Sequence, residues 1–243
     1  MISSRFFSVS FLAAVFFLFS CNGSDEKSSA DQPGADTTAT AEPVAPSTIS
    51  TTPQSMLLVR HKVSDYTKWK ASYDAHDSLR QAAGMRNYVI GRGAEDSNMV
   101  MVAVKTDDMA KAKAFAKDAK LKDAMQKGGV RGAPSFSFFT ATFQDTAVIS
   151  SALRSLTTFT VKDWDAWQKG FNEGKQERID NGIVDRVYGH DADNDKKVML
   201  VVAVMDTAKA SAYWKSDMLK KRREASGVVS TPDRFVFRIV QRY

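Results

Sequence analysis

Histidine is the side chain best suited to proton transfer near neutral pH, because free imidazole titrates at about pH 6.5. The chain contains three histidines, at positions 61, 76 and 190. His61 lies in an alternating segment, on the same predicted strand face as Leu57 and Val59. On that face it could accept a proton inside a cavity. The alternative interpretation is a histidine that ends a strand near water.

His76 follows Trp69 by seven residues and Tyr73 by three, so it flanks the apolar stripe of a predicted helix. Its alternative interpretation is an ordinary residue at the edge of a helix. We take His61 and His76 as candidate catalytic residues, with His61 as the general base.

Three further residues could hold the polar end of a ligand. Arg60 precedes His61 in the same predicted strand, and Arg60 or Arg92 could steer an anion toward it. Arg92 and His190 each end a predicted strand, where they could also be ordinary residues beside a turn. We take Arg60, Arg92 and His190 as candidate ligand-binding residues.

The sequence predicts no metal site and no cofactor. The three histidines are dispersed, and the only cysteine is Cys21. Residues 191–195 open like a calcium-binding loop, with three aspartates at alternate positions. Lys196 then stands where that loop needs glycine, and Val202 where it needs a bidentate glutamate.

The segments that position these residues occur twice in the sequence, and the second copy follows the first at a shift of 98 residues. Agreement of aromatic residues and glycines at one shift indicates an internal duplication, and we expect repeats at residues 55–145 and 153–243. The coinciding pairs are Asp65 with Asp163, Trp69 with Trp167, Tyr73 with Phe171, Arg80 with Arg178, Gly84 with Gly182, Gly91 with Gly189, Leu121 with Leu219, Gly129 with Gly227, and Pro134 with Pro232.

Each repeat reads as β-α-β-β-α-β, which is a ferredoxin-like α+β unit. In the first repeat we predict strands at 56–63, 85–91, 99–105 and 134–143, and helices from Asp65 to Gly84 and over 107–127. Two helices cover one face of the sheet and leave its other apolar face open. We therefore expect the two repeats to pack sheet to sheet as an eight-stranded barrel, with the helices outside, in a monomeric chain.

The motifs of the first repeat resemble the dimeric α+β barrel superfamily, in particular proteins related to antibiotic-biosynthesis monooxygenases. The resemblance implies that this chain is a fused pair of units that usually associate as a dimer. The motifs that carry it are Val63-x-Asp65-Tyr66-x-x-Trp69-x-x-x-Tyr73-Asp74-x-His76, Leu121-Lys-x-Ala124-Met125 and Pro134-x-Phe136.

The resemblance implies a fold more than an activity, because the superfamily includes oxygenases, haem-handling proteins and isomerases. Its cofactor-free monooxygenases and haem degraders use an asparagine, a tryptophan and a histidine that line a cavity. Here neither first strand contains asparagine, and a tryptophan on the second helix occurs only in the second repeat, as Trp214. This departure argues against haem or oxygen chemistry by that set.

The N-terminus has the pattern of an export signal. Arg5 precedes an apolar stretch from Phe6 to Phe19 that is too short to span a bilayer. Residues 18–21 then resemble the lipobox of bacterial lipoproteins, which implies cleavage after residue 20 and acylation of Cys21. We expect a signal peptide at 1–20, a lipidated cysteine and disordered tether at 21–54, and a location in the bacterial cell envelope, at the outer membrane.

Charge and composition favour a globular domain over a nucleic-acid-binding protein. The net charge is +6, but the lysines are scattered along predicted helices among aspartates and alanines, as on a solvated helix face. Two functions remain open. The chain could bind a small apolar ligand between its two sheets, or it could be a cofactor-independent monooxygenase or isomerase that acts on an aromatic or polyketide-like molecule.

Overall fold

The computed structural model describes residues 47–243. The predicted signal peptide, Cys21 and most of the predicted tether lie outside the described residues. In the described part of that tether, β1 (Ile49–Ser50) pairs with the end of β5 (Val130–Asp145). The folded unit therefore begins before the expected boundary at residue 55. Among the described residues, no helix has the length and apolar character needed to cross a membrane.

Both repeats have the predicted order of elements, but each predicted helix is divided in two. The first repeat contains β2 (Gln54–Val63), α1 (Tyr66–Ala75), α2 (Asp77–Ala82), β3 (Met85–Gly93), β4 (Met99–Thr106), α3 (Met109–Phe115), α4 (Ala119–Lys127) and β5. The second contains β6 (Leu153–Thr160), α5 (Trp164–Glu173), α6 (Lys175–Asp180), β7 (Ile183–Asp191), β8 (Lys197–Val204), α7 (Thr207–Trp214), α8 (Asp217–Ala225) and β9 (Asp233–Arg242).

Aspartates begin α1, α3, α4, α5 and α7, and Asp65 does so at α1 as the sequence predicts. The Asp65 carboxylate accepts a hydrogen bond from the backbone N–H of Lys68 at 2.6 Å, and Asp163 starts α5 in the same way. At the other end of the predicted helix, Gly84 has a φ of +71°, which suits glycine after a helix C-terminus. The expected limits of this helical segment are therefore confirmed.

The continuous helix predicted between these limits is interrupted at His76, between α1 and α2. The second repeat has the same interruption at Gly174, between α5 and α6. Because the break occurs at corresponding positions with different residues, it belongs to the fold and not to histidine. Helical spacing across the break could not show it.

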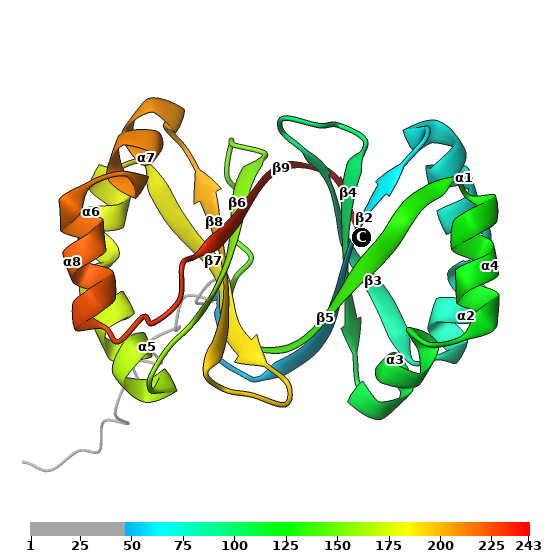
Figure 1. Cartoon of the computed structure of the whole chain (residues 1–243), viewed down its shortest axis with the longest axis horizontal. Coiled ribbons are helices and arrows are strands. Elements are labelled where there is room, and N and C mark those ends of the chain that lie inside the picture. The colour runs from blue at the N-terminus through cyan, green and yellow to red at the C-terminus, as the bar shows by residue number, and fades with distance from the viewer. Residues whose placement is uncertain (1–46) are drawn as a thin grey trace, which may run out of the picture. The chain divides into compact units, whose positions relative to one another are not determined.

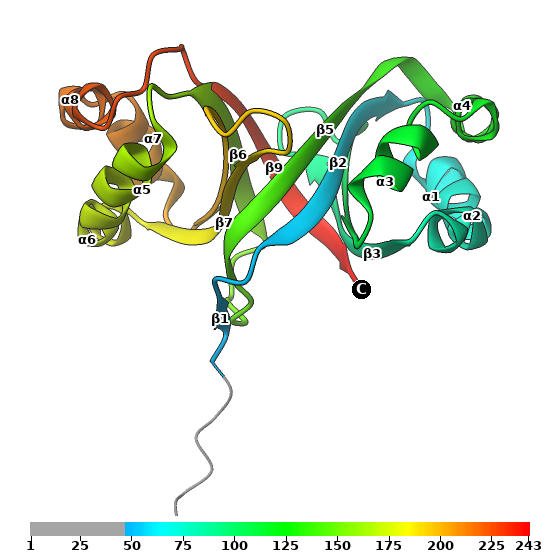
Figure 2. The same cartoon turned by 90° about the horizontal axis from the view of Figure 1, so that it is seen from below.

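The eight long strands of residues 47–243 form one closed antiparallel barrel. The hydrogen-bonded order is β5-β2-β4-β3-β9-β6-β8-β7, and β7 pairs again with β5. The predicted fused α+β barrel is thus confirmed, with hydrogen bonds joining the two sheets at both edges. Figure 1 shows the helices of the two repeats on opposite outer sides of this barrel, and Figure 2 shows β5 and β9 crossing it.

Glycine is required where the two repeats join. At Gly91, on the β3–β9 junction, an added Cβ would lie 2.3 Å from the Phe237 ring. At Gly189, on the β7–β5 junction, it would lie 1.9 Å from the Thr140 carbonyl oxygen. These glycines coincide in the internal repeat because each permits the close approach that closes the barrel.

Alternating residues of the strands serve two separate cores. Met56 and Leu58 of β2 point into the barrel, where they pack with residues of both repeats such as Leu156 and Phe237. Leu57 points outward and packs under α1 with Trp69. The strand period of two therefore gives each repeat one barrel face and one helix-covered face.

Candidate functional site

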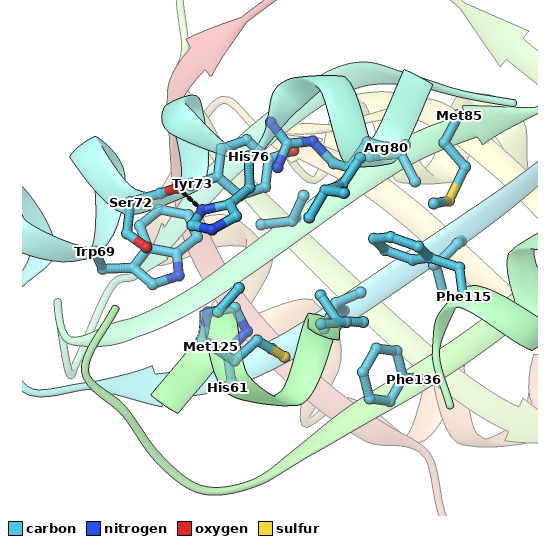
Figure 3. Close-up of a pocket in the computed structure, with 17 residues that line it drawn as sticks. His61, Trp69, Ser72, Tyr73, His76, Arg80, Met85, Phe115, Met125 and Phe136 are labelled. Carbon is cyan, nitrogen blue, oxygen red and sulfur yellow. Dashed lines mark hydrogen bonds between the residues drawn. The ribbon is translucent and has the colours of Figure 1, made fainter. Parts of the chain in front are cut away.

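The helix-covered face of the first repeat contains an apolar cavity of about 80 Å³. Its floor is the outer face of β2 and β4, and its walls come from α1, α2, α3 and α4 (Figure 3). Five side chains of the lining have polar atoms that can form hydrogen bonds: His61, Ser72, Tyr73, His76 and Arg80. The remaining lining is aliphatic or aromatic, including Leu79, Phe115, Met125 and Phe136.

His61 lies on the floor of this cavity and is only 3% exposed. Its ring packs at 5.4 Å from the Trp69 ring. Both imidazole nitrogens are buried, and neither has a hydrogen-bond partner among residues 47–243. Burial lowers the pKa of His61 to about 4, so the side chain is neutral at physiological pH.

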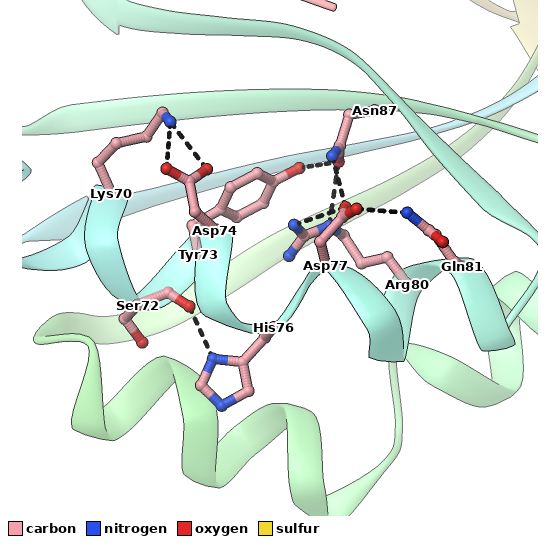
Figure 4. A network of polar contacts seen from close by, with 9 residues as sticks. All are labelled: Lys70, Ser72, Tyr73, Asp74, His76, Asp77, Arg80, Gln81 and Asn87. Carbon is pink, nitrogen blue, oxygen red and sulfur yellow. Dashed lines mark hydrogen bonds and ion pairs between the residues drawn. The ribbon is translucent and has the colours of Figure 1, made fainter.

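His76 reaches the same cavity from the break between α1 and α2. Its Nδ1 lies 2.7 Å from the Ser72 carbonyl oxygen (Figure 4). A carbonyl only accepts hydrogen bonds, so in the neutral ring Nδ1 carries the proton and Nε2 keeps its lone pair. The break in the helix therefore positions a histidine with a defined tautomer at the cavity wall.

A polar network fixes the far side of the cavity, below α2 (Figure 4). The Arg80 guanidinium packs 3.6 Å from the centre of the Tyr73 ring and donates to Asn87 at 3.0 Å and to Asp77 at 3.1 Å. The Tyr73 hydroxyl donates to Asn87 at 2.6 Å, and burial raises the pKa of Tyr73. These contacts hold Arg80 and Tyr73 in place in the cavity wall.

Three predicted ligand-binding residues lie away from this cavity. Arg60 points to the barrel side, 3.6 Å from Asp233 and over the Phe235 ring. Arg92 lies over the Tyr66 ring and donates from Nε to the Ser97 carbonyl at 2.7 Å.

His190 packs edge-on against Trp164, at 4.9 Å between ring centres, and its Nδ1 lies 3.0 Å from the Asp191 carbonyl oxygen. The structure therefore brings His61 and His76 together and separates them from Arg60, Arg92 and His190.

Sequence reasoning missed Arg80 and Tyr73 as cavity residues. Both coincide with residues of the second repeat, Arg178 and Phe171, so the repeat marked them as residues of the fold. The signal that could have found them is their helical spacing from His76, since three and four residues separate them from it.

Residues 47–243 contain no cluster of three histidine, cysteine or carboxylate side chains able to hold a metal ion. His61 and His76 could supply two nitrogen ligands at most, and the other polar side chains of the lining are Ser72, Tyr73 and the cationic Arg80, so the cavity contains no carboxylate or thiolate. The chemistry that this set supports is recognition of a small molecule by apolar contact and one or two hydrogen bonds.

No protein-family model matches the chain, and no curated protein sequence matches it. Its fold is similar to that of a provisionally assigned monooxygenase from Lactobacillus acidophilus NCFM (TM-score 0.50, 12% identity, covering 77% of this chain and 93% of that chain). It is also similar to a provisionally assigned monooxygenase from Fusobacterium nucleatum subsp. nucleatum ATCC 25586 (TM-score 0.52, 11% identity, covering 78% and 93%). A third similar structure is an anthrone oxidase-like protein (TM-score 0.52, 11% identity, covering 77% and 92%). The chain is thus structurally similar to dimeric α+β barrel proteins, at identities that show the fold alone.

Proposed function

We propose that the first repeat binds a small, largely apolar molecule with one hydroxyl group, in the cavity between its helices and its sheet. The observation that carries this proposal is His61, a neutral imidazole buried in an apolar cavity with both nitrogens unpaired among the described residues. A buried polar group without a partner costs about 1–3 kcal/mol. A hydroxyl group both donates and accepts, so it can satisfy a neutral imidazole from either side.

The size of the cavity limits the ligand. Each water-sized group needs about 10–15 Å³ of cavity volume. The cavity of 80 Å³ therefore holds on the order of six such groups. That is the size of a phenol and much less than a polyketide. In the barrel interior, where the sequence leads us to expect a ligand, Met56, Leu58, Phe139 and Phe237 leave a cavity of only about 60 Å³. Its lining includes three arginines and an aspartate, which suit an uncharged ligand less well. The proposal therefore moves the apolar ligand from the space between the sheets to the helix-covered face.

Calorimetric titration with phenol and with benzene tests the proposal. We expect phenol to bind the purified protein about tenfold more tightly than benzene, since only phenol pairs with His61. The variant H61F carries the residue that the second repeat has at this position, Phe159, and should lose the preference. The matched control H190F replaces a histidine away from the cavity and should keep it. Equal affinity of phenol for wild type and H61F, or no binding to wild type, contradicts the proposal.

The alternative is a cofactor-independent oxygenase or isomerase, and His76 is the observation that favours it. Its Nδ1 is fixed by the Ser72 carbonyl, which leaves Nε2 as a proton acceptor at the cavity wall. His61 is a weak base, because its pKa of about 4 lies far below neutral pH. Oxygen uptake with bound phenol that disappears in H76A would favour the enzyme, while stable binding without turnover would exclude it for this ligand class.

We also propose that acylation of Cys21 anchors the chain to the bacterial cell envelope. This proposal rests on the sequence of the N-terminus, which lies outside the described residues. Labelling with radioactive palmitate should mark the wild-type protein and leave C21S unlabelled and released from the membrane fraction. A labelled C21S, or an unlabelled wild type in the membrane fraction, contradicts it.

A further inference from the structure

One end of the barrel interior is lined by several arginine side chains that have no role in the proposed function. A cavity of about 60 Å³ lies between strands of both repeats, and most of its wall is apolar, with Met101, Phe139 and Phe237 among its residues. Its charged lining consists of three arginines and one aspartate, which are Arg154, Arg186, Arg242 and Asp145. This cavity is inside the barrel, whereas the cavity of His61 lies on the outer face of the sheet.

Arg154 is the most deeply buried charge of the described residues, at 1% exposure. Its Nη1 donates to the carbonyl oxygens of Ser151 at 2.8 Å and Leu153 at 2.9 Å. Its Nη2 is buried and has no acceptor among residues 47–243, and within that range Arg154 forms no ion pair. A guanidinium enclosed without an anion is unfavourable, because desolvation is not repaid by a partner charge.

The nearby carboxylate does not neutralise Arg154. Asp145 accepts from Arg186 at 3.1 Å, and Arg186 also donates to the Ala147 carbonyl at 2.5 Å. Arg242, at the exposed end of β9, adds a further positive charge. Burial, together with the charges of Arg242 and Arg186, lowers the pKa of Arg154 to about 10. The cavity therefore has more positive than negative charge before any ligand is bound.

The fold itself does not require these cations. The positions that correspond to Arg154 and Arg186 in the first repeat are Met56 and Tyr88, and they line the same cavity. Across β6 and β8, Arg154 pairs with the small residue Ala203, whereas across β2 and β4 Met56 pairs with Lys105. One half of a nearly symmetric cavity has therefore acquired a buried charge that the other half lacks.

We propose that this end of the barrel binds a small monocarboxylate, with its carboxylate on Arg154 and Arg242 and its apolar tail in the barrel. The planar fork of a guanidinium matches the two oxygens of a carboxylate. The apolar residues beyond the arginines match an alkyl tail better than a fully hydrated inorganic ion. A volume of 60 Å³ holds on the order of five water-sized groups, which corresponds to an acid the size of isobutyrate.

Thermal unfolding with sodium isobutyrate tests this site, with sodium chloride and sodium phosphate at matched ionic strength as the comparison. For wild type we expect isobutyrate to raise the melting temperature by roughly 5–10 °C at about 100 times its Kd. Chloride and phosphate should raise it much less. No rise with isobutyrate, or an equal rise with all three anions, overturns the proposal.

Variants separate binding from folding. R154M installs the residue of the first repeat, and we expect it to fold, to melt at or above the wild-type temperature without ligand, and to lose the isobutyrate response. R242L alters an exposed residue and should reduce the response without reducing basal stability. R238M, a control at an arginine on the exposed side of β9, should respond like wild type. An unchanged response in both R154M and R242L overturns the proposal, and H61F should keep the full response because its cavity is separate.

Discussion

The helix-covered faces of the two repeats share one backbone plan but differ in the side chains that line their cavities. In the first repeat the cavity is lined by Leu79, Phe115 and Ala124 around the neutral His61. In the second repeat the corresponding positions hold Glu177, Tyr213, Arg222 and Phe159. There the Glu177 carboxylate accepts from the Tyr213 hydroxyl at 2.6 Å and from Arg222 Nε at 3.0 Å. The second repeat thus also has a cavity here, of about 70 Å³, but Tyr213 and Arg222 of a partly exposed ionic network line it in place of apolar side chains.

Two corresponding pairs of residues, His76 with Ala124 and Gly174 with Arg222, show how the same backbone accommodates both sets of side chains. In the first repeat His76 stands at the helix break and lines the same cavity as the small Ala124 on α4. In the second repeat the break is Gly174, and an added Cβ there would lie 3.0 Å from Arg222. The large side chain has moved from one helix to the other. The fold therefore requires one large group at this place and does not specify its chemistry, so His76 is available for a function.

The largest expected difference between the repeats concerns their buried arginines. Arg178 forms two hydrogen bonds with Asp185, at 2.8 and 2.6 Å, and both side chains are almost fully buried. Its counterpart Arg80 meets the neutral Asn87 instead and relies on the more exposed Asp77. We expect D185N to lose about 3–5 kcal/mol of unfolding free energy, because Arg178 is left as a buried charge without a counter-ion.

Urea unfolding of D185N and of the reverse variant N87D measures this difference. N87D gives Arg80 a carboxylate but places it beside Asp77, which now accepts from the Asn87 side chain at 2.7 Å. The attraction between the new carboxylate and Arg80 is opposed by its repulsion from Asp77. We therefore expect the unfolding free energy of N87D to differ from that of wild type by less than about 1 kcal/mol. Equal losses in the two variants would show that the two arginines are held in the same way.

The second difference appears on acidification. The pKa of His61 is about 4 in the folded protein and 6.5 when unperturbed, so between these values the unfolded chain binds more protons. Stability therefore falls as the pH drops from 6.5 to 4, by up to about 1.4 kcal/mol per pH unit and about 3 kcal/mol in all. In the second repeat Phe159 occupies this position and cannot contribute such a loss.

The measurement is the unfolding free energy of wild type and H61F between pH 4 and 8. We expect the two curves to run in parallel above pH 6.5 and to separate below it, with H61F the more stable at acid pH. H190F provides the control and should keep the wild-type dependence. Parallel curves over the whole range would show that His61 becomes protonated in the folded protein without difficulty.

The sequence predicts the barrel well because the residues that coincide in the two repeats lie where the backbone geometry of the fold permits few residue types. Gly91 and Gly189 coincide since each lies where a strand of one repeat pairs with a strand of the other. The alternation around His61 correctly places it on one strand face with Leu57 and Val59, and the structure shows that this face is the helix-covered one. Periodicity records which face a residue takes, so these features can be read without the structure.

The site is predicted only in part, because it depends on contacts between segments far apart in the chain. The alternation of β2 does not show whether the space above His61 is filled, since that depends on α4. Arg154 escaped notice for a similar reason. Its burial results from closure of the barrel by β9, and only the packed structure shows that Nη2 lacks an acceptor.

The smallest expected effect comes from a second exchange between helices. Ser72 on α1 faces Gly128 after α4, and in the second repeat Gly170 faces Ser226. An added Cβ at Gly128 would lie 3.0 Å from the Ser72 hydroxyl, and one at Gly170 would lie 3.0 Å from the Ser226 Cβ. Each contact therefore has room for one serine, placed on opposite helices in the two repeats.

A double-mutant cycle over S72G and G128S measures this steric coupling. G128S alone should cost about 1 kcal/mol through crowding, and S72G alone about 0.5–1 kcal/mol as a glycine within a helix. The double variant reproduces the arrangement of the second repeat and should cost less than the sum of the two by about 1 kcal/mol. The combination of G128S with S226G, which joins contacts of different repeats, should be additive. If S72G and G128S are also additive, the two faces tolerate serine independently, and the exchange is not a packing constraint.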